Sequence, residues 1–337
     1  MSDTVLLAHG SGGQLGHDLV TRVFARAFAN PLLDRMDDSA VFALQPREGR
    51  LAFTTDSYVI TPLFFPGGDI GRLAVCGTVN DLAMSGARPL ALSAAFVIEE
   101  GLALSDLERI AASMAAAARE AGVQIVTGDT KVVERGHADG CFITTAGVGV
   151  VAPGLDISGA NARPGDRVLL SGTVADHGMA IMSRREGLRF ETPLESDCAP
   201  LNGLVQAMLE VCPDIHCLRD PTRGGLATTL NEIARQSQVE IAVDEAQIAV
   251  RPAAQGLCEL LGLDPLYVAN EGKLVAVVPP GAAEAVLEVM RRHHLGREAT
   301  AIGEVHAGRA GRVTLRTALG ARRVLDMMVG ELLPRIC

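Results

Sequence analysis

Apolar residues recur along the chain in two different patterns. Short apolar or alternating runs bounded by Gly, Pro, Asn or Asp are typical of strands, and apolar residues three or four positions apart are typical of helices. The strand-like runs are Leu51–Thr54, Leu90–Ile98, Ile125–Thr127, Cys141–Val151, Arg167–Ser171, Ile241–Val243, Leu274–Val278 and Arg312–Leu315. The helix-like stretches are Ile70–Met84, Leu104–Ala121, Ala199–Val211, Gly225–Ser237, Ala253–Leu261 and Ala282–His293. Their alternation predicts an α/β or α+β fold.

The helix expected over Leu104–Ala121 carries signals at both of its ends. Ser105 is a candidate N-cap, and Glu108 follows it by three residues, which is the spacing of a capping box. Gly122 comes directly after the last apolar position and is expected to end the helix.

The segment Val151–Gly165 is rich in Pro, Gly, Asn and Ser and follows the longest strand-like run. Such a segment is typical of a linker, and 337 residues are enough for two domains. We therefore expect an N-terminal domain over 1–155, a C-terminal domain over 156–325 and a mobile tail over 326–337.

The last residues given are Pro334-Arg335-Ile336-Cys337. Pro334 disfavours a helix at the preceding residue, so the tail is expected to be extended. At ~3.3 Å per residue, the eight residues from 330 to 337 span about 26 Å, enough to reach another domain or subunit. A cysteine on such a tail could carry a chemical group, but 7 of the 337 residues are Cys, so this position alone decides nothing.

Composition narrows the class of protein. Hydrophobic residues make up 48% and aromatic residues 3%, so the core must be largely aliphatic. The formal net charge is −10 and no dense Lys/Arg stripe occurs, which argues against nucleic-acid binding. No apolar stretch approaches the ~18 residues needed to cross a bilayer, and no signal peptide is visible. These features predict a cytoplasmic protein with no nucleic-acid or membrane partner.

The seven cysteines do not form a recognisable metal or disulfide pattern. No CxxC occurs, and Cys212 and Cys217 lack a second pair that would complete a zinc site. A disulfide framework is not expected in a chain of this length with a large aliphatic core. We therefore expect free thiols, including that of Cys337.

Aspartates follow strand-like runs or precede expected helices at five places. They are Asp38, which follows Asp37, and Asp56, Asp81, Asp129 and Asp220. Carboxylates from different elements can converge at such positions, where Mg²⁺ is held together with waters and nucleotide phosphates. Turns and helix caps are the alternative for any single aspartate. Their number and the nearby glycines favour metal–nucleotide binding, with the choice between Asp37 and Asp38 left open.

Two glycine-rich segments are candidate phosphate sites. His9-Gly10-Ser11-Gly12-Gly13 could wrap phosphates with backbone N–H groups. It is neither a Walker A loop, because no GKS or GKT follows, nor a dinucleotide fingerprint. Thr222-Arg223-Gly224-Gly225 directly precedes an expected helix and is the second candidate. A plain turn remains the alternative for each.

Lysine is scarce, since only Lys131 and Lys273 occur among 30 Lys and Arg residues. Lys131 follows a predicted strand directly, and Lys273 follows Asn270-Glu271-Gly272. A desolvated ammonium can lose its proton, which an arginine does not do. Lys131 and Glu271 are therefore candidate functional residues, with surface ion pairing as the alternative. His177 fits a hydrogen-bonded structural histidine better than a catalytic one.

With these residues in view, the chain resembles the HypE family of hydrogenase maturation proteins, within the AIR synthase-like superfamily of ATP-binding enzymes. The matching segments are His9–Gly13, Thr55–Ser57, Pro62–Gly68, Asn80–Ala83, Thr127–Val132, Arg223–Gly225, Asn270–Lys273 and Pro334–Cys337. They cover the whole chain, and the terminal Pro-Arg-Ile-Cys is the most diagnostic. Pro221 is a local variant next to Asp220.

The resemblance implies an AIR synthase-like two-domain fold. Its N-terminal domain pairs with that of a second copy to close a β-barrel, and its C-terminal domain is α/β. It also implies that the carbamoyltransferase HypF loads a carbamoyl group onto Cys337. The chain would dehydrate this group to a thiocyanate with ATP, and the cyano group would pass to iron on the HypC–HypD scaffold for [NiFe]-hydrogenase.

From this resemblance we expect three sets of site residues. The catalytic set is Cys337, Lys131 and Glu271. The ATP-binding set is Gly10, Ser11, Gly12, Gly13, Asp56, Asn80, Asp81, Gly128, Asp129, Thr130 and Arg223. The Mg²⁺-binding set is Asp38, Asp56, Asp81, Asp129 and Asp220.

Two other functions stay open at this point. The first is another AIR synthase-like enzyme that acts with ATP on a free small molecule, such as a thiamine-phosphate kinase or a selenophosphate synthetase. The latter resembles proteins with a Cys close to a Lys near the N-terminus, whereas the first Cys here is Cys76 and no early Lys occurs. The second is a non-catalytic carrier that passes a cysteine-bound group between partners.

Overall fold

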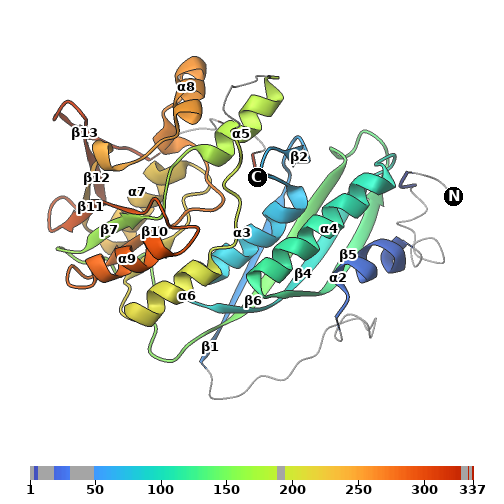
Figure 1. Ribbon diagram of the computed structural model, residues 1–337, viewed down its shortest axis with the longest axis horizontal. Coiled ribbons are helices and arrows are strands. Elements are labelled where there is room, and N and C mark those ends of the chain that lie inside the picture. Colours follow the sequence, from blue (N-terminus) through green and yellow to red (C-terminus); the bar gives the residue numbers. More distant parts are fainter. Residues whose placement is uncertain (1–3, 7–18, 31–48, 188–193, 328–332, 334–335) are drawn as a thin grey trace.

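The computed structural model describes residues 4–6, 19–30, 49–187, 194–327, 333 and 336–337 (Figure 1). The predictions for Gly10, Ser11, Gly12, Gly13 and Asp38 lie outside these ranges.

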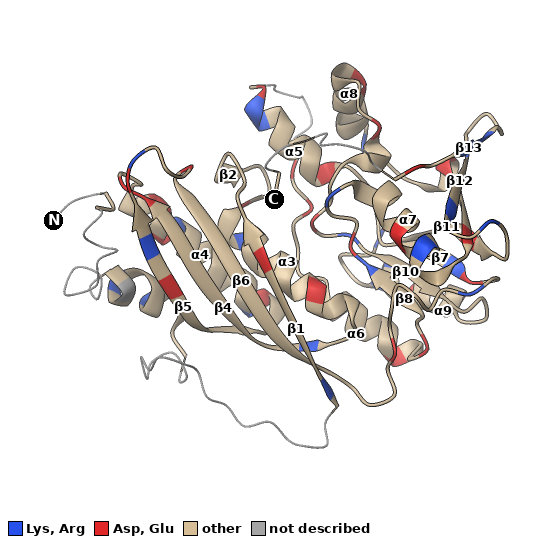
Figure 2. Ribbon diagram, turned by 180° about the vertical axis from the view of Figure 1, so that it is seen from behind, with Lys and Arg blue, Asp and Glu red and all other residues tan. Residues whose placement is uncertain are grey.

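The first sheet has four strands in the order β1-β6-β4-β5. The strands are β1 (Arg50–Tyr58), β4 (Arg88–Glu99), β5 (Gln124–Val133) and β6 (Cys141–Val151). Helices α3 (Ile70–Met84) and α4 (Leu104–Ala121) cover one face, and Figure 2 shows the opposite face without a covering helix. Burial therefore alternates along β1, where Phe53 is 72% exposed and Tyr58 is 1% exposed.

Helix α3 is buried nearly all round because it packs both on the first sheet and on the second half of the chain. Its N-cap is Asp69, whose side chain accepts hydrogen bonds from the N–H groups of Gly71 and Arg72. Its last residues, Ala83 and Met84, belong to the apolar core beneath the second sheet. A helix that is apolar on every side is typical of such a shared position.

The second sheet has seven strands in the order β13-β12-β9-β11-β7-β10-β8. The strands are β7 (Arg167–Leu170), β8 (Cys217–Arg219), β9 (Glu240–Asp244), β10 (Val275–Val278), β11 (Thr300–His306), β12 (Arg312–Arg316) and β13 (Arg322–Val324). The helices of this half are α5 (Asp176–Arg185), α6 (Asn202–Val211), α7 (Gly225–Ser237), α8 (Pro252–Leu261) and α9 (Ala283–Arg292). Short elements complete the description: the π-helix η2 (Val20–Ala25), α2 (Arg26–Phe28), the hairpin β2 (Phe64–Phe65) and β3 (Gly68–Asp69), and the 3₁₀ helices η4 (Glu245–Gln247) and η5 (Pro265–Tyr267).

The predicted α/β class is confirmed, and most element predictions agree with the structure. The boundaries of α3, α4, α7 and β6 match those expected from the sequence. The Ser105 cap was wrong, because α4 begins at Leu104 and its N-cap, Ala103, has no side chain able to accept a bond. Gly122 does end this helix, in the left-handed region at φ 68°.

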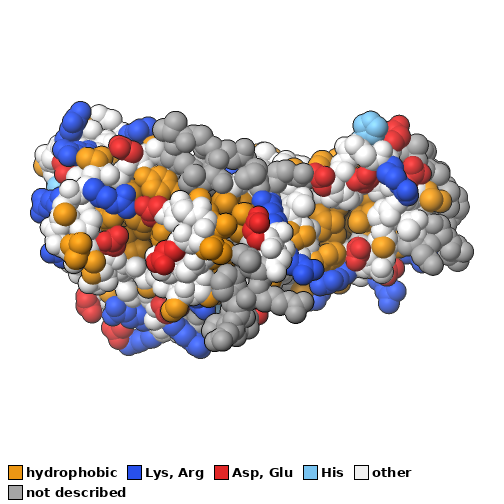
Figure 3. Space-filling view, turned by 90° about the horizontal axis from the view of Figure 1, so that it is seen from above, with side chains coloured by type: hydrophobic (Ala, Val, Ile, Leu, Met, Phe, Trp, Pro, Cys, Tyr) orange, Lys and Arg blue, Asp and Glu red, His pale blue; other side chains and the backbone are white. Residues whose placement is uncertain are grey.

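The two sheets draw their strands from 50–151 and from 167–324. The domain limits 1–155, 156–325 and 326–337 remain predictions. On the face seen in Figure 3, acidic and basic side chains are interspersed, so this face offers no continuous basic stripe. Across the described ranges, no helix combines the length and the apolar character that a membrane span requires.

Candidate active site

The end of the chain lies inside the protein, at the junction of the two sheets. Ile336 is 4% exposed and Cys337 is partly buried, and both pack against the core beneath the first sheet. The Val59 N–H donates to the main-chain oxygen of Cys337 at 3.3 Å. Nε2 of His177 lies 2.8 Å from the Ile336 carbonyl oxygen. The structure therefore holds the tail in a docked position.

The surroundings of the Cys337 sulfur keep it in the thiol form. Burial raises the pKa of Cys337 to about 12, the carboxyl groups of Glu271 and Asp56 add to the rise, and Arg223 opposes it. The charges of Glu271, Asp56 and Arg223 therefore all act on the Cys337 sulfur. A thiolate would be the nucleophile, so a docked thiol with this pKa is a poor attacking group and an inert carrier.

Glu271 is the buried carboxyl group of this site, on the loop that leads to β10. Its residue is 3% exposed, and no described side chain hydrogen-bonds its carboxyl oxygens. Burial raises the pKa of Glu271 well above its usual value, and the charges of Asp220 and Asp197 raise it further. A carboxyl group with a raised pKa is suited to proton transfer close to neutral pH.

Asp197 fixes the backbone that carries Glu271. Its carboxylate accepts hydrogen bonds from the N–H groups of Glu271 (3.1 Å) and Gly272 (3.2 Å) and from Nζ of Lys273 (3.1 Å). Burial opposes its ionisation, but Lys273, His177 and the Glu271 N–H lower the pKa of Asp197 overall. Gly272 is required here, since a Cβ would lie 1.8 Å from the Asp197 carbonyl oxygen. Lys273 thus supports the loop through Asp197.

Two buried asparagines fasten the same loop from both sides. Asn80 of α3 donates to the carbonyl oxygens of Glu271 (3.2 Å) and Ala199 (3.1 Å), and its Oδ1 accepts from the Leu201 N–H. Asn270 is held by main-chain partners in the same way. The predicted ATP contact of Asn80 therefore has no free donor hydrogen, because both hydrogens already position the second half of the chain.

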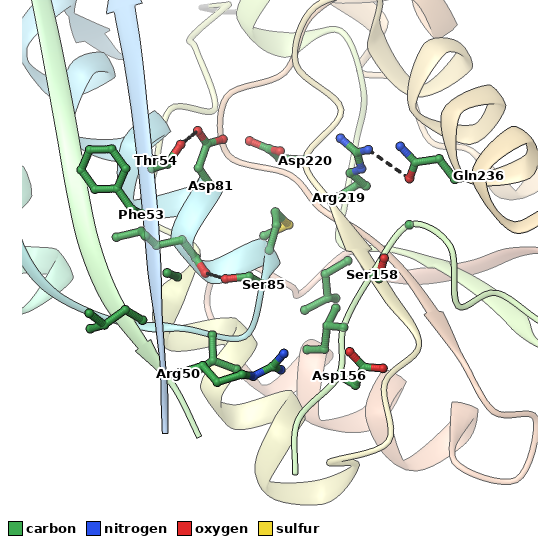
Figure 4. Close-up of a pocket in the computed structure, with 18 residues that line it drawn as sticks. Arg50, Phe53, Thr54, Asp81, Ser85, Asp156, Ser158, Arg219, Asp220 and Gln236 are labelled. Atoms are coloured by element: carbon green, nitrogen blue, oxygen red, sulfur yellow. Dashed lines mark hydrogen bonds between the residues drawn. The ribbon is translucent and has the colours of Figure 1, made fainter. Parts of the chain in front are cut away.

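A pocket of about 680 Å³ lies between the edge strands of the two sheets, β1 and β8 (Figure 4). Ligand pockets commonly have this size. Arg50 and Asp156 line one end, and Asp81 and Asp220 line the other (Figure 4). The lining also includes apolar side chains, namely Leu82, Met84, Val151, Ile157 and Leu218.

The carboxyl groups at this end of the pocket repel one another. Asp81, on α3, accepts a hydrogen bond from Thr54 at 2.7 Å, and burial and Asp56 raise its pKa. Burial, with the charges of Asp81 and Asp56, raises the pKa of Asp220 to about 7. Arg219 and Arg223 lie close enough to lower the pKa of Asp81. This cluster has an excess of negative charge that a bound cation would relieve.

Mg²⁺ fits this cluster only together with a ligand. Within the part of the chain that the structure describes, no three His, Cys, Asp or Glu side chains converge into a metal site. Mg²⁺ in phosphate sites commonly takes one or two carboxylates, with waters and phosphate oxygens completing its shell. The residues present suit that arrangement, with Asp56, Asp81 and Asp220 as the available carboxylates.

The predicted residues of β5 lie elsewhere on the sheet. Lys131 and Asp129 form an ion pair at 3.1 Å, and their side chains are 65% and 60% exposed. Strand pairing aligns Asp56 with Thr145, Ala94 and Gly128 in one row across the four strands. Three strand spacings of about 4.8 Å separate the two ends of this row by roughly 14 Å. Within one chain, Gly128, Asp129, Thr130 and Lys131 therefore lie on the opposite edge strand from β1, and Cys337 is hydrogen-bonded to Val59, which follows β1.

Several site residues could not be found from the sequence. Asp197 and Ser196 lie in no recognisable motif, and Arg50, Asp156 and Gln236 line the pocket from unrelated segments. Only the full set of long-range contacts identifies them.

Comparison with known proteins adds to this geometry. A family model described as AIR synthase related protein, N-terminal domain, matches residues 36–151, and the corresponding C-terminal domain matches 163–316. Carbamoyl dehydratase HypE of Azotobacter vinelandii is 59% identical over 334 residues, which cover 99% of this chain and 97% of the relative. The chain belongs to the HypE family. The AIR synthase-like fold expected from the sequence is thereby confirmed.

Solved structures of HypE proteins agree with this membership. A hydrogenase maturation protein HypE in complex with ATP has a TM-score of 0.95 and 53% identity, covering 99% of this chain and all of that chain. The HypE chain of a HypE–HypF complex has a TM-score of 0.80 and 51% identity, covering 92% of this chain and 99% of that chain. The fold of this HypE-family chain therefore has close experimental counterparts.

Proposed function

We propose that this chain is an ATP-dependent carbamoyl dehydratase that converts an S-carbamoyl group on its own Cys337 into a thiocyanate. The thiocyanate would donate the cyanide ligand of iron during [NiFe]-hydrogenase maturation. The observation that carries the proposal is the docked Cys337, which lies in the electrostatic field of the buried carboxyl group of Glu271. The close relatives named carbamoyl dehydratase HypE support the same activity.

The reaction must turn the carbamoyl oxygen into a leaving group. In the first step this oxygen attacks the γ-phosphorus of ATP, the bond from that phosphorus to the bridging oxygen breaks, and ADP leaves. In the second step the nitrogen gives up both hydrogens as protons, and the carbon–oxygen bond breaks with its electron pair going to phosphate. The carbon–nitrogen triple bond is then complete, and no oxidant or reductant is needed.

Glu271 is the proposed base for the second step. Its electrostatic influence on Cys337 supports a position near the carbamoyl nitrogen, and burial raises its pKa above the usual value, as suits a group that exchanges protons. Asp197, Asn80 and the obligatory Gly272 fix the backbone of Glu271, which limits the movement of the base relative to the docked tail.

The pocket between β1 and β8 is the proposed ATP site, because its lining combines apolar side chains that suit a nucleobase with the carboxyl groups of Asp81 and Asp220. Mg²⁺ held by one or two of the carboxylates of Asp56, Asp81 and Asp220, together with phosphate oxygens and waters, would neutralise the negative charge of the phosphates. Arg223, which influences both Asp81 and Cys337, is placed to attract phosphate oxygens. The HypE structure solved with ATP supports nucleotide binding in this family.

A homodimer is part of the proposal, because the sheet face opposite α3 is uncovered and carries exposed apolar groups. Leu51 is 60% exposed, Phe53 is 72% exposed and Val97 is 36% exposed. A second copy placed on this face would bury them and close the barrel expected for the family. It would also offer a route by which Lys131 of one chain reaches Cys337 of the other, where its ammonium would stabilise the developing negative charge of the oxygen.

The proposed partners are the carbamoyltransferase HypF, which would load Cys337, and the HypC–HypD complex, which would receive the cyano group. The HypE–HypF complex among the solved relatives supports the first of these. We propose a cytoplasmic location for this pathway. The close relatives named carbamoyl dehydratase favour catalysis over a carrier without catalysis, which would not need a buried base beside the carried group.

The test uses chain carbamoylated at Cys337 with heavy oxygen in the carbamoyl group. On addition of ATP and Mg²⁺, the C-terminal peptide should lose the mass of one water, and the heavy oxygen should appear in inorganic phosphate. Cys337→Ala should bind ATP and form no thiocyanate. ATP-independent mass loss, or heavy oxygen released into water, would rule out the phosphorylated intermediate. A mass that stays unchanged with ATP would favour the simple carrier.

A further inference from the structure

The docked tail contacts a buried imidazole that the proposed chemistry does not use. His177, the second residue of α5, is fully buried. Its Nε2 lies 2.8 Å from the Ile336 carbonyl oxygen, and its Nδ1 lies 2.8 Å from Oγ of Ser196. A histidine with a partner on each ring nitrogen has a fixed orientation.

The partners also determine where the hydrogens lie. A carbonyl oxygen only accepts, so Nε2 must carry the hydrogen that bonds to Ile336. Burial lowers the pKa of His177, which favours the neutral ring, and Nδ1 is then an acceptor for the Ser196 hydroxyl. The same hydroxyl oxygen accepts from the Cys198 N–H at 3.1 Å. The chain of hydrogen bonds from Cys198 to Ile336 is therefore complete and directional.

The seat of the imidazole is built from both halves of the protein. The ring of Phe65, in the β2 hairpin, meets His177 edge to face at 5.6 Å. The Ser196 N–H donates to the Pro66 carbonyl oxygen at 2.9 Å. Gly178 follows His177, and a Cβ there would lie 3.3 Å from Leu333 of the tail. The tail thus passes close to the first turn of α5, with the imidazole rigidly held beneath it.

We propose that His177, oriented by Ser196, is the positioning residue that holds the docked tail in register. It binds the main-chain carbonyl one residue before the thiol, so it sets the reach of the Cys337 sulfur without touching the group on it. The same bond suits a free, carbamoylated or cyanated cysteine, because the backbone is identical in all three. The role of this contact in positioning the carried group rests on the proposed function, but the contact between His177 and Ile336 itself does not.

The test measures the rate at which iodoacetamide alkylates Cys337 in the full chain without ATP, followed by peptide mass spectrometry. His177→Asn keeps a polar atom near Ser196 and loses the donor to Ile336. His177→Gln places an amide nitrogen near the Nε2 position and restores that donor. His216→Asn is the matched control, since His216 is also buried and pairs with Asp166 at 2.7 Å, outside the site.

We expect His177→Asn to raise alkylation of Cys337 about tenfold, the effect of losing one hydrogen bond of ordinary strength. His177→Gln and His216→Asn should stay within about twofold of the wild type, and the six internal cysteines should not change. Should His177→Asn fail to fold, Ser196→Ala supplies the same comparison, because it leaves the imidazole but removes its orienting partner.

An unchanged rate at Cys337 in His177→Asn would overturn the proposal. So would a rise shared by all seven cysteines, or an equal rise in His216→Asn, since either would show a general loosening of the fold. The assay uses neither a carbamoyl group nor ATP. An absence of dehydratase activity in the wild type would therefore refute the proposed function without affecting the proposal that His177 positions the tail.

Discussion

Acidic groups lie near both edges of the four-stranded sheet, and the pKa shifts of the two groups are opposite. Beyond β1, burial and mutual repulsion raise the pKa of Asp81 and bring that of Asp220 to about 7. On β5, hydrogen bonds from Lys131 and the Thr130 N–H lower the pKa of Asp129. The residue types are the same, but only the first group is half-buried and short of cationic partners. Burial, more than residue type, therefore prepares a carboxylate for proton or metal chemistry.

The largest expected effect is at Glu271, in the buried group. Glu271→Gln keeps the size and the backbone bonds but removes the base, so single-turnover dehydration of the carbamoylated chain should slow by about 10²–10⁴-fold. Glu259→Gln, on α8 outside the site, is the control and should react like the wild type. Equal rates in the two variants would remove Glu271 from the mechanism.

The second prediction concerns whether dimerisation brings Lys131 of one chain to Cys337 of the other. Lys131→Ala and Cys337→Ala should each be inactive alone. If Lys131 serves the other chain, dissociating and mixing the two variants should restore about a quarter of the wild-type sites, because random pairing makes one intact site in each mixed dimer. A mixture that stays inactive, with mixed dimers demonstrated by native mass spectrometry, would place Lys131 outside the shared site.

The third prediction concerns pH and stability without nucleotide or metal. Asp220 has a pKa of about 7 in the folded chain and an ordinary pKa near 3.9 when unfolded. The folded state therefore binds the extra proton, and stability falls as pH rises between these two values. Asp220→Asn should stabilise the chain at pH ~8 by about 1–2 kcal/mol and have little effect near pH ~4.

Asp129, in the exposed group on β5, provides the matched comparison, and the smallest change in stability is expected there. The pKa of Asp129 is lowered on folding, so its ion pair adds stability above its unfolded pKa and loses it as the pH falls through the folded pKa. Asp129→Asn should reduce stability at neutral pH by no more than about 0.3 kcal/mol. Denaturant titrations of Asp220→Asn at pH ~8 and ~4, and of Asp129→Asn at neutral pH, measure these changes in the free energy of unfolding. A destabilising effect of Asp220→Asn at pH ~8 would contradict the comparison.

Local patterns were enough for the strongly periodic elements. Helices α3, α4 and α7 have apolar positions at helical spacing, and the boundaries predicted for them match the structure. Helix α5 was missed because it begins after Ala175 in the left-handed region at φ 75°, with Asp-His-Gly as its first turn. Strand β8 has only three residues and strand β13 is fully exposed, so neither gives a usable pattern.

Only the site residues that lie in recognisable sequence motifs could be predicted. Glu271 and Cys337 were both singled out from the sequence, and the structure brings them into one electrostatic environment. Their neighbours depend on contacts between distant segments, as in the bond from Asn80 to Glu271 across 191 positions of the chain. The predicted site residues on β5 show a second limit, because the sequence of β5 does not reveal that Lys131 lies on the uncovered face of the sheet.

Strand β1 would also affect the behaviour of the chain before it forms the proposed dimer. It is nine residues long, lies at the edge of its sheet and presents Phe53 at 72% exposure. Long edge strands with exposed aromatic groups are templates for intermolecular pairing and hence for aggregation. Rapid formation of the proposed dimer would therefore protect a newly made subunit from aggregation. Charged substitutions on β1 that block this dimer should reduce aggregation of the monomer and abolish its dehydratase activity.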